Sequence, residues 1–159
     1  MNEHKLTKLI ELIASLPRAQ PYYRLILVVG PIGSGKTPLL KALAREQEVP
    51  YLNLNLALSQ RLLDVTTRER PLRARRIVEN LIAQHPGDTI ALDNIELLFD
   101  PALQLNPLAL LQRLSRQRTV IAAWGGTYDA GRDVLTYAKP GHPEYTRCEE
   151  PEGMLLTLP

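Results

Sequence analysis

The chain has 159 residues, of which 45% are hydrophobic and 23% are charged, and its formal net charge is +2. This length fits one domain with a proper core over residues 1–159, and the composition is that of an ordinary soluble globular protein. No apolar run reaches the roughly 20 residues that cross a bilayer, which excludes the membrane-spanning classes. The single Cys148 and three scattered histidines offer neither an internal disulfide nor metal-ligand spacing.

Residues 1–20 carry acidic residues within an apolar pattern and lack a small-residue cleavage site. These features indicate an amphipathic helix rather than a signal peptide. We expect this helix to pack on the core, because most amphipathic helices bury their apolar face against their own domain. We therefore expect a cytoplasmic protein without a membrane partner.

Beyond this helix, short apolar runs alternate with helical patterns, which is typical of a parallel sheet covered on both faces. The expected strands are residues 25–29, 50–56, 89–94, 119–124 and 133–137, and the expected helices are residues 37–47, 57–65, 71–85 and 107–117. The pattern predicts an α/β fold in three layers with a mostly parallel five-stranded sheet.

The segment "GPIGSGKT", residues 30–37, matches the phosphate-binding pattern G-x-x-x-x-G-K-[ST] between an expected strand and an expected helix. Glycines let the loop direct backbone N–H groups at phosphate oxygens, and the following helix adds positive potential. Lys36 is expected to contact the β- and γ-phosphates of ATP and Thr37 to ligate Mg²⁺. The expected nucleotide-binding residues are Gly30, Gly33, Ser34, Gly35, Lys36 and Thr37.

Asp93, at the end of the expected strand "TIALDN", is the candidate Walker B carboxylate and a second Mg²⁺ ligand. We expect it at a strand end outside the core. The number of residues between Lys36 and Asp93 is similar to that in one class of P-loop proteins. In that class an extra strand separates the strand before the phosphate loop from the strand that carries the Walker B carboxylate. Asn94 stands where such proteins carry a water-activating glutamate, and an amide cannot accept that proton. Either a turn at Asn94 brings Glu96 to the site as a displaced base, or hydrolysis is slow.

Pro38 directly follows the Lys-Thr pair. Proline is acceptable in the first turn of a helix, but it has no N–H to donate to the α-phosphate. We therefore expect weaker nucleotide binding than in a chain with another residue there.

Three arginines, Arg113, Arg116 and Arg118, lie on or after the helix that precedes the fourth strand. Ring-forming AAA+ proteins present an arginine from this region to a neighbour's nucleotide, where it stabilises transition-state charge. The alternative is a set of solvent arginines that complement the helix dipole. Trp124 stands where a polar sensor residue is expected, and little sequence remains for a helical lid. We therefore expect a P-loop NTPase core that is AAA+-like without the lid.

A second arginine group occurs in "RERPLRARR" and is either a solvated helix face or a DNA contact. Its members are Arg68, Arg70, Arg73, Arg75 and Arg76.

The segments "GPIGSGKT", "ALDNIELLFDPALQLNPLALLQRLSRQRTVIAAW" and "LTYAKPGHPEY" together resemble the BrxF family, the small P-loop proteins of BREX phage-resistance systems. The resemblance covers most of residues 25–145. It implies a bacterial protein that restricts phage together with other BREX subunits.

Two functions follow from these residues. The first is an ATP-binding, weakly hydrolysing subunit in which Lys36, Asp93, Glu96 and Asn94 form the catalytic centre and a partner or second copy supplies an arginine. The second is a nucleotide-dependent switch or scaffold without significant hydrolysis. DNA binding through the second arginine group is compatible with either.

Overall fold

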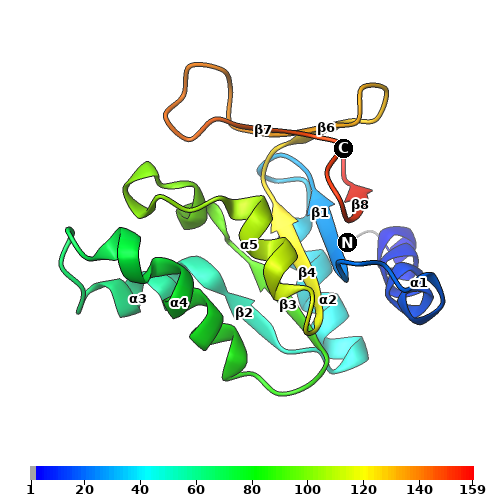
Figure 1. Cartoon of the computed structure of the whole chain (residues 1–159). Coiled ribbons are helices and arrows are strands. Elements are labelled where there is room, and N and C mark those ends of the chain that lie inside the picture. Colours follow the sequence, from blue (N-terminus) through cyan, green and yellow to red (C-terminus); the bar gives the residue numbers. More distant parts are fainter. Residues whose placement is uncertain (1–2) are drawn as a thin grey trace.

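Five parallel strands form the central sheet, in the order β2-β3-β4-β1-β8 (Figure 1). The computed structural model describes residues 3–159. The strands are β1 (Leu25–Val29), β2 (Tyr51–Asn53), β3 (Thr89–Asp93), β4 (Thr119–Trp124) and β8 (Met154–Thr157). The predicted α/β fold with a parallel five-stranded sheet is confirmed. Strand β4 separates β1 from β3, as the spacing of the two motifs predicted.

Helices cover both faces of this sheet. They are α1 (Glu3–Ala19), α2 (Lys36–Gln47), α3 (Leu54–Leu62), α4 (Arg70–Ala83) and α5 (Pro107–Leu114), with the short 3₁₀ helices η1 (Glu96–Phe99) and η2 (Pro101–Leu103). None of the helices in residues 3–159 is long and apolar enough to cross a membrane.

Strand β1 shows how the sequence divides the core between the two faces. Leu25, Leu27 and Val29 pack into a cluster with α3, α4 and α5, while Ile26 and Val28 pack with α1 and α2 on the other face. All five side chains are buried because successive residues of a strand point to opposite faces of a sheet that is covered twice. Helix α1 contributes Leu6, Leu9 and Leu16 to the second cluster.

The identity of the fifth strand was predicted wrongly. Residues 133–137 were expected to complete the parallel sheet, but β6 (Val134–Tyr137) belongs to a separate antiparallel sheet. The fifth parallel strand is β8, which pairs with β1 and buries Leu156. The prediction failed because "MLLT" contains only three consecutive apolar residues beside an acidic segment, with no local pattern that specifies its partner.

The second strand is also shorter than predicted. Residues 50–56 alternate apolar and polar side chains, yet β2 ends at Asn53 and α3 begins at Leu54. The Asn53 side chain accepts a hydrogen bond from the Leu56 backbone N–H at 3.1 Å. This N-cap stabilises a helix start within the alternating segment.

A small antiparallel sheet follows β4 and lies above the carboxyl ends of β1 and β4 in Figure 1. Its strands are β5 (Thr127–Asp129), β6 and β7 (Thr146–Glu149). Tyr137 of β6 stacks on Phe99 with ring centroids 3.6 Å apart, and the Trp124 indole N–H donates to the Thr136 carbonyl at 3.0 Å. Within residues 3–159 no helix follows α5.

Candidate nucleotide-binding site

The loop between β1 and α2 is a tightly curled glycine-rich turn. Gly33 and Gly35 have φ angles of 82° and 99°, in the left-handed region that glycine adopts without strain. A Cβ atom on Gly30 would lie 2.4 Å from Ser34 Oγ and 3.0 Å from the Leu158 carbonyl oxygen, so any side chain there would force Ser34 to move. The loop therefore presents its backbone at the amino end of α2, where the helix dipole favours an anion.

Lys36, the first residue of α2, folds back over this loop. Its Nζ donates hydrogen bonds to the carbonyl oxygens of Gly30 at 2.6 Å and Pro31 at 2.8 Å. Burial lowers the pKa of Lys36, while the negative charges of Glu96 and Asp93 act in the opposite direction. The loop thus holds a positive charge beside two carboxylates.

Asp93, the last residue of β3, is held by three donors. Its Oδ2 accepts from the Thr37 hydroxyl at 2.7 Å and the Tyr51 hydroxyl at 2.5 Å, and its Oδ1 accepts from the Asn94 N–H at 3.0 Å. The carboxylate lies at the strand end as expected, but only 2% of the residue is exposed, so the expectation that it lies outside the core is wrong. The structure therefore joins Thr37 and Asp93, the two expected Mg²⁺ ligands.

The backbone turns sharply between Asp93 and Glu96. Asn94 has a φ of 49°, in the left-handed region, and η1 begins at Glu96. Asn55 holds this turn, because its N–H donates to the Asn94 carbonyl and its side-chain oxygen accepts from the Leu97 N–H, both at 2.8 Å. Glu96 consequently lines the same pocket as Lys36 and Asp93. An extended strand would have directed the Glu96 side chain away from Asp93. The turn instead brings it to the site.

The pocket fits a nucleotide phosphate with Mg²⁺. Its volume is about 210 Å³, and its lining includes Lys36, Thr37, Asp93 and Glu96. Ser34, which stands between the lining residues Gly33 and Gly35, has a buried Oγ without a hydrogen-bond partner among the described residues. Residues 3–159 contain no group of three or more His, Cys, Asp or Glu side chains that could hold a metal alone. This donor set suits Mg²⁺, which proteins commonly hold with one or two carboxylates and the phosphates of a substrate.

Pro38 and Trp124 are the two residues that depart from the expected P-loop pattern. Pro38 is the third residue of α2, exposed at the rim of the phosphate pocket. Trp124 is fully buried, in edge contact with Phe99, and its N–H is bonded within the protein. Trp124 is therefore a core residue that fixes the junction of the two sheets.

Two of the candidate arginines donate hydrogen bonds to backbone carbonyls at helix ends. Arg70 donates to the Leu62 and Val65 carbonyls at the carboxyl end of α3, and Arg118 donates to the Ile82 and His85 carbonyls at the carboxyl end of α4. Both thus complement the negative end of a helix dipole.

The other arginines that the sequence offered as candidates are exposed. They are Arg68, Arg73, Arg75, Arg76, Arg113 and Arg116. Arg113 forms an ion pair with Glu79, and the Arg116 guanidinium lies 4.0 Å from the centroid of the Tyr22 ring. Arg113 and Arg116 precede the start of β4, so they lie toward the amino ends of the parallel strands. The P-loop of this chain lies at the opposite, carboxyl ends. Neither arginine lines the phosphate pocket of this chain.

Tyr51 and Asn55 are site residues that the sequence analysis missed. Burial and the hydrogen bond to Asp93 raise the pKa of Tyr51 above its ordinary value, so this hydroxyl remains a donor. No local motif marks either residue. Tyr51 reaches Asp93 because Asn53 of β2 pairs with Asp93 of β3, a register that only the assembled sheet defines.

Comparisons with known proteins identify the family of the chain. The model of the ATPase family associated with various cellular activities, AAA, matches residues 26–122, more than half of the chain. The replication factor C large subunit of Sulfurisphaera tokodaii is 33% identical over 89 residues, which cover 56% of this chain and 19% of that protein. The ATP-dependent zinc metalloprotease FtsH of Acaryochloris marina is 40% identical over 60 residues, which cover 33% of this chain and 9% of that protein. The chain thus spans only a small part of either relative, but the family match extends from β1 into β4. The chain belongs to the AAA family.

Proposed function

We propose that this chain binds Mg·ATP at the P-loop and hydrolyses it slowly until an assembly completes the site. The observation that carries the proposal is the constellation of Lys36, the hydrogen-bonded pair of Thr37 and Asp93, and Glu96 around one pocket. Membership of the AAA family also supports ATP binding and hydrolysis.

Each residue has a role that its chemistry supports. Lys36 would exchange its two carbonyl partners for phosphate oxygens, and the loop N–H groups would donate to the same phosphates. Thr37 and Asp93 would hold Mg²⁺, which neutralises charge that develops on the transferred phosphoryl group. Glu96 is exposed at the pocket and can accept a proton from water, which the Asn94 amide cannot do.

The assembly we propose is a bacterial BREX phage-defence complex in the cytoplasm, with other BREX subunits or a second copy of this chain as partners. The resemblance to the BrxF family supports this context. An arginine from a neighbouring subunit would stabilise the transition state, and Arg113 and Arg116 are the exposed candidates on this chain.

The test is Mg·ATP binding and turnover across a protein concentration series, with Glu96→Gln and Lys36→Ala beside the wild type. We expect turnover per chain to rise with concentration, to collapse in Glu96→Gln with binding retained, and to vanish in Lys36→Ala together with binding. Equal turnover of Glu96→Gln and wild type would refute the assignment of Glu96. Unchanged ATP binding by a folded Lys36→Ala would refute the site itself.

The alternative is a nucleotide-dependent switch without significant hydrolysis. Asn94 at the usual base position favours it, and so does the engagement of Asp93 by three donors. This alternative predicts that the wild type binds ATP and releases it unhydrolysed at every protein concentration.

A further inference from the structure

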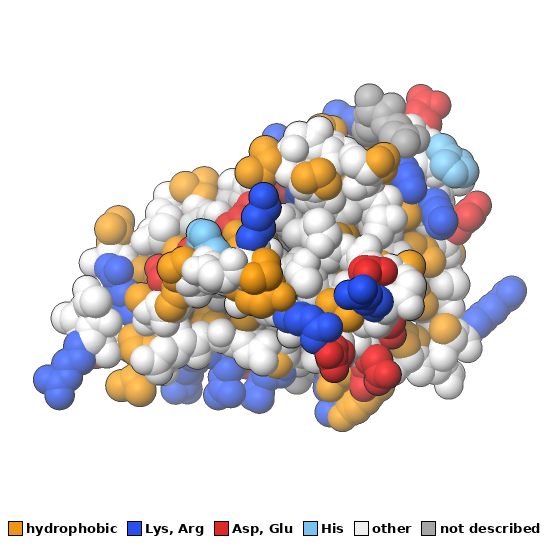
Figure 2. Space-filling model, turned by 90° about the horizontal axis from the view of Figure 1, so that it is seen from above, with side chains coloured by type: hydrophobic (Ala, Val, Ile, Leu, Met, Phe, Trp, Pro, Cys, Tyr) orange, Lys and Arg blue, Asp and Glu red, His pale blue; other side chains and the backbone are white. Residues whose placement is uncertain are grey.

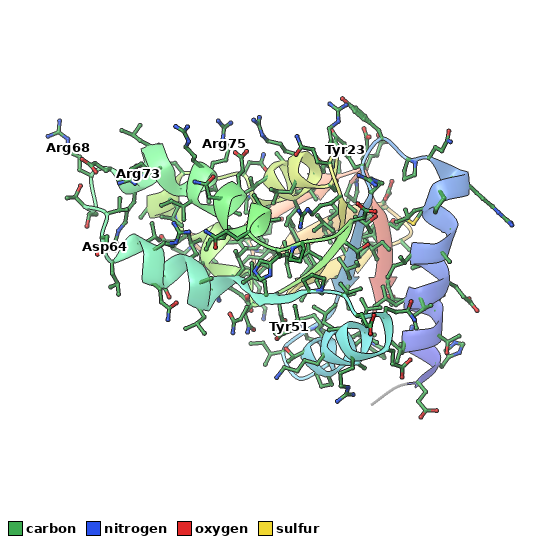
Figure 3. The ribbon with its side chains drawn as sticks, turned by 90° about the horizontal axis from the view of Figure 1, so that it is seen from below. Tyr23, Tyr51, Asp64, Arg68, Arg73 and Arg75 are labelled. Carbon is green, nitrogen blue, oxygen red and sulfur yellow. The ribbon has the colours of Figure 1, made fainter. Side chains whose placement is uncertain are left out.

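A basic groove lies on the face formed by α4 and α5, outside the nucleotide site. Its volume is about 660 Å³, and it extends from the start of α4 past α5 to the segment that precedes β1. Figure 2 shows Lys and Arg side chains along the lower margin of the molecule, and Figure 3, seen from the opposite side, shows Arg68, Arg73 and Arg75 along one edge with Tyr23. One member of the "RERPLRARR" group and two members of the other arginine group therefore line the same groove.

The charge of the groove is positive. Arg75 of α4 lines it together with Arg113 and Arg116 from the α5 region, and no carboxylate is among its described lining residues. Glu79 lies beside the groove, where it pairs with Arg75 at 3.3 Å and with Arg113 at 3.8 Å. One carboxylate thus holds two guanidinium groups near each other while neutralising only one of their charges.

The groove also offers flat and apolar surface. Tyr22 and Tyr23 stack with ring centroids 4.7 Å apart, and the Arg116 guanidinium extends this stack over Tyr22. Tyr22 is 56% exposed and Leu72 is 83% exposed, although both are large hydrophobic residues. Aromatic rings and guanidinium planes are surfaces on which unpaired bases stack.

We propose that this groove binds single-stranded nucleic acid. The arginines would contact consecutive phosphates, while the bases would lie against the Arg116–Tyr22–Tyr23 stack and Leu72. A duplex is the poorer fit because it presents phosphates and sugars on its outside and keeps its base faces stacked inside, so the exposed apolar surface would gain nothing. The groove shares no lining residue with the phosphate pocket of the same chain, so this proposal does not depend on ATP binding by that chain.

The test is fluorescence anisotropy with the full chain and a labelled oligothymidylate of about 20 nucleotides, beside a duplex of the same length. We expect the single strand to bind more tightly than the duplex, with an affinity that falls steeply as salt rises. Arg75→Ala should lower the magnitude of the log–log salt slope by about 0.7, and Tyr22→Ala should weaken binding about tenfold at constant salt. Glu79→Gln should tighten binding because it removes the neutralising carboxylate.

Arg45→Ala is the matched control, since Arg45 is an exposed arginine in the last turn of α2, on the other face of the sheet. It should leave oligothymidylate binding unchanged, and Arg75→Ala should leave ATP binding unchanged. The proposal is overturned if the duplex binds as tightly as the single strand, if neither binds at low salt, or if Arg45→Ala weakens binding as much as Arg75→Ala does.

Discussion

Removing the Tyr51 hydroxyl tests the network that holds Asp93. Tyr51→Phe keeps the ring but deletes the donor that lies 2.5 Å from Asp93 Oδ2. Hydrogen bonds to charged groups contribute about 1.5–3 kcal/mol to stability, so we expect the free energy of unfolding to fall by about 2 kcal/mol. Thr37 and the Asn94 N–H still donate to the carboxylate, so the larger cost of an unpaired buried charge does not arise.

Urea unfolding followed by circular dichroism measures this loss of stability. An unchanged m-value, the slope of the unfolding free energy against urea concentration, would show that the folded and unfolded states keep their compactness. For a chain of this size the melting temperature should fall by about 4–8 °C. In an Asp93→Asn background the same substitution should cost clearly less, because the partner charge is gone. Tyr22→Phe, at an exposed tyrosine, is the control and should change stability by less than about 0.5 kcal/mol. A loss for Tyr51→Phe as small as the control's would refute the network.

Three further predictions concern other parts of the chain. Pro38→Ala restores an N–H in the first turn of α2 and should tighten ATP binding about tenfold by isothermal titration calorimetry; affinity no higher than that of the wild type would count against the role of Pro38. Gly126→Ala should destabilise the fold by at least about 2 kcal/mol in thermal unfolding, since its Cβ would lie 1.8 Å from the Thr136 carbonyl oxygen, whereas Gly131→Ala, with its nearest contact at 3.4 Å, should be tolerated. Burial, followed by the charges of Glu144 and Glu96, raises the pKa of Tyr137 to about 12 from an ordinary value of 10.0. The stability that comes from this raised pKa is therefore complete below pH 10 and is lost as the pH rises toward 12. The free energy of unfolding of Tyr137→Phe should consequently fall less steeply over that range than that of the wild type. Parallel plots of unfolding free energy against pH for the two proteins would contradict this.

The sequence by itself determined the parts of this protein whose physics is local. The glycine pattern and the Lys-Thr pair between a buried strand and a helix predicted the phosphate loop, because a short segment contains everything that its backbone needs. The apolar run of β1 predicted a strand covered on both faces, since both of its side-chain sets are hydrophobic. Asp93 was likewise predicted at the end of its strand.

Only the tertiary structure decided the features that depend on pairing between distant segments. Strand β8 joins β1, and Tyr51 reaches Asp93, through sheet registers that no short-range pattern contains. The turn that brings Glu96 to the pocket depends on Asn55, a residue on α3 that contacts it only after folding. Similarly, Arg75 shares one groove with Arg113 and Arg116, which are far from it in the chain, because α4 and α5 lie against the same face of the sheet. Such contacts are set by packing between elements, and packing is the information that a linear pattern lacks.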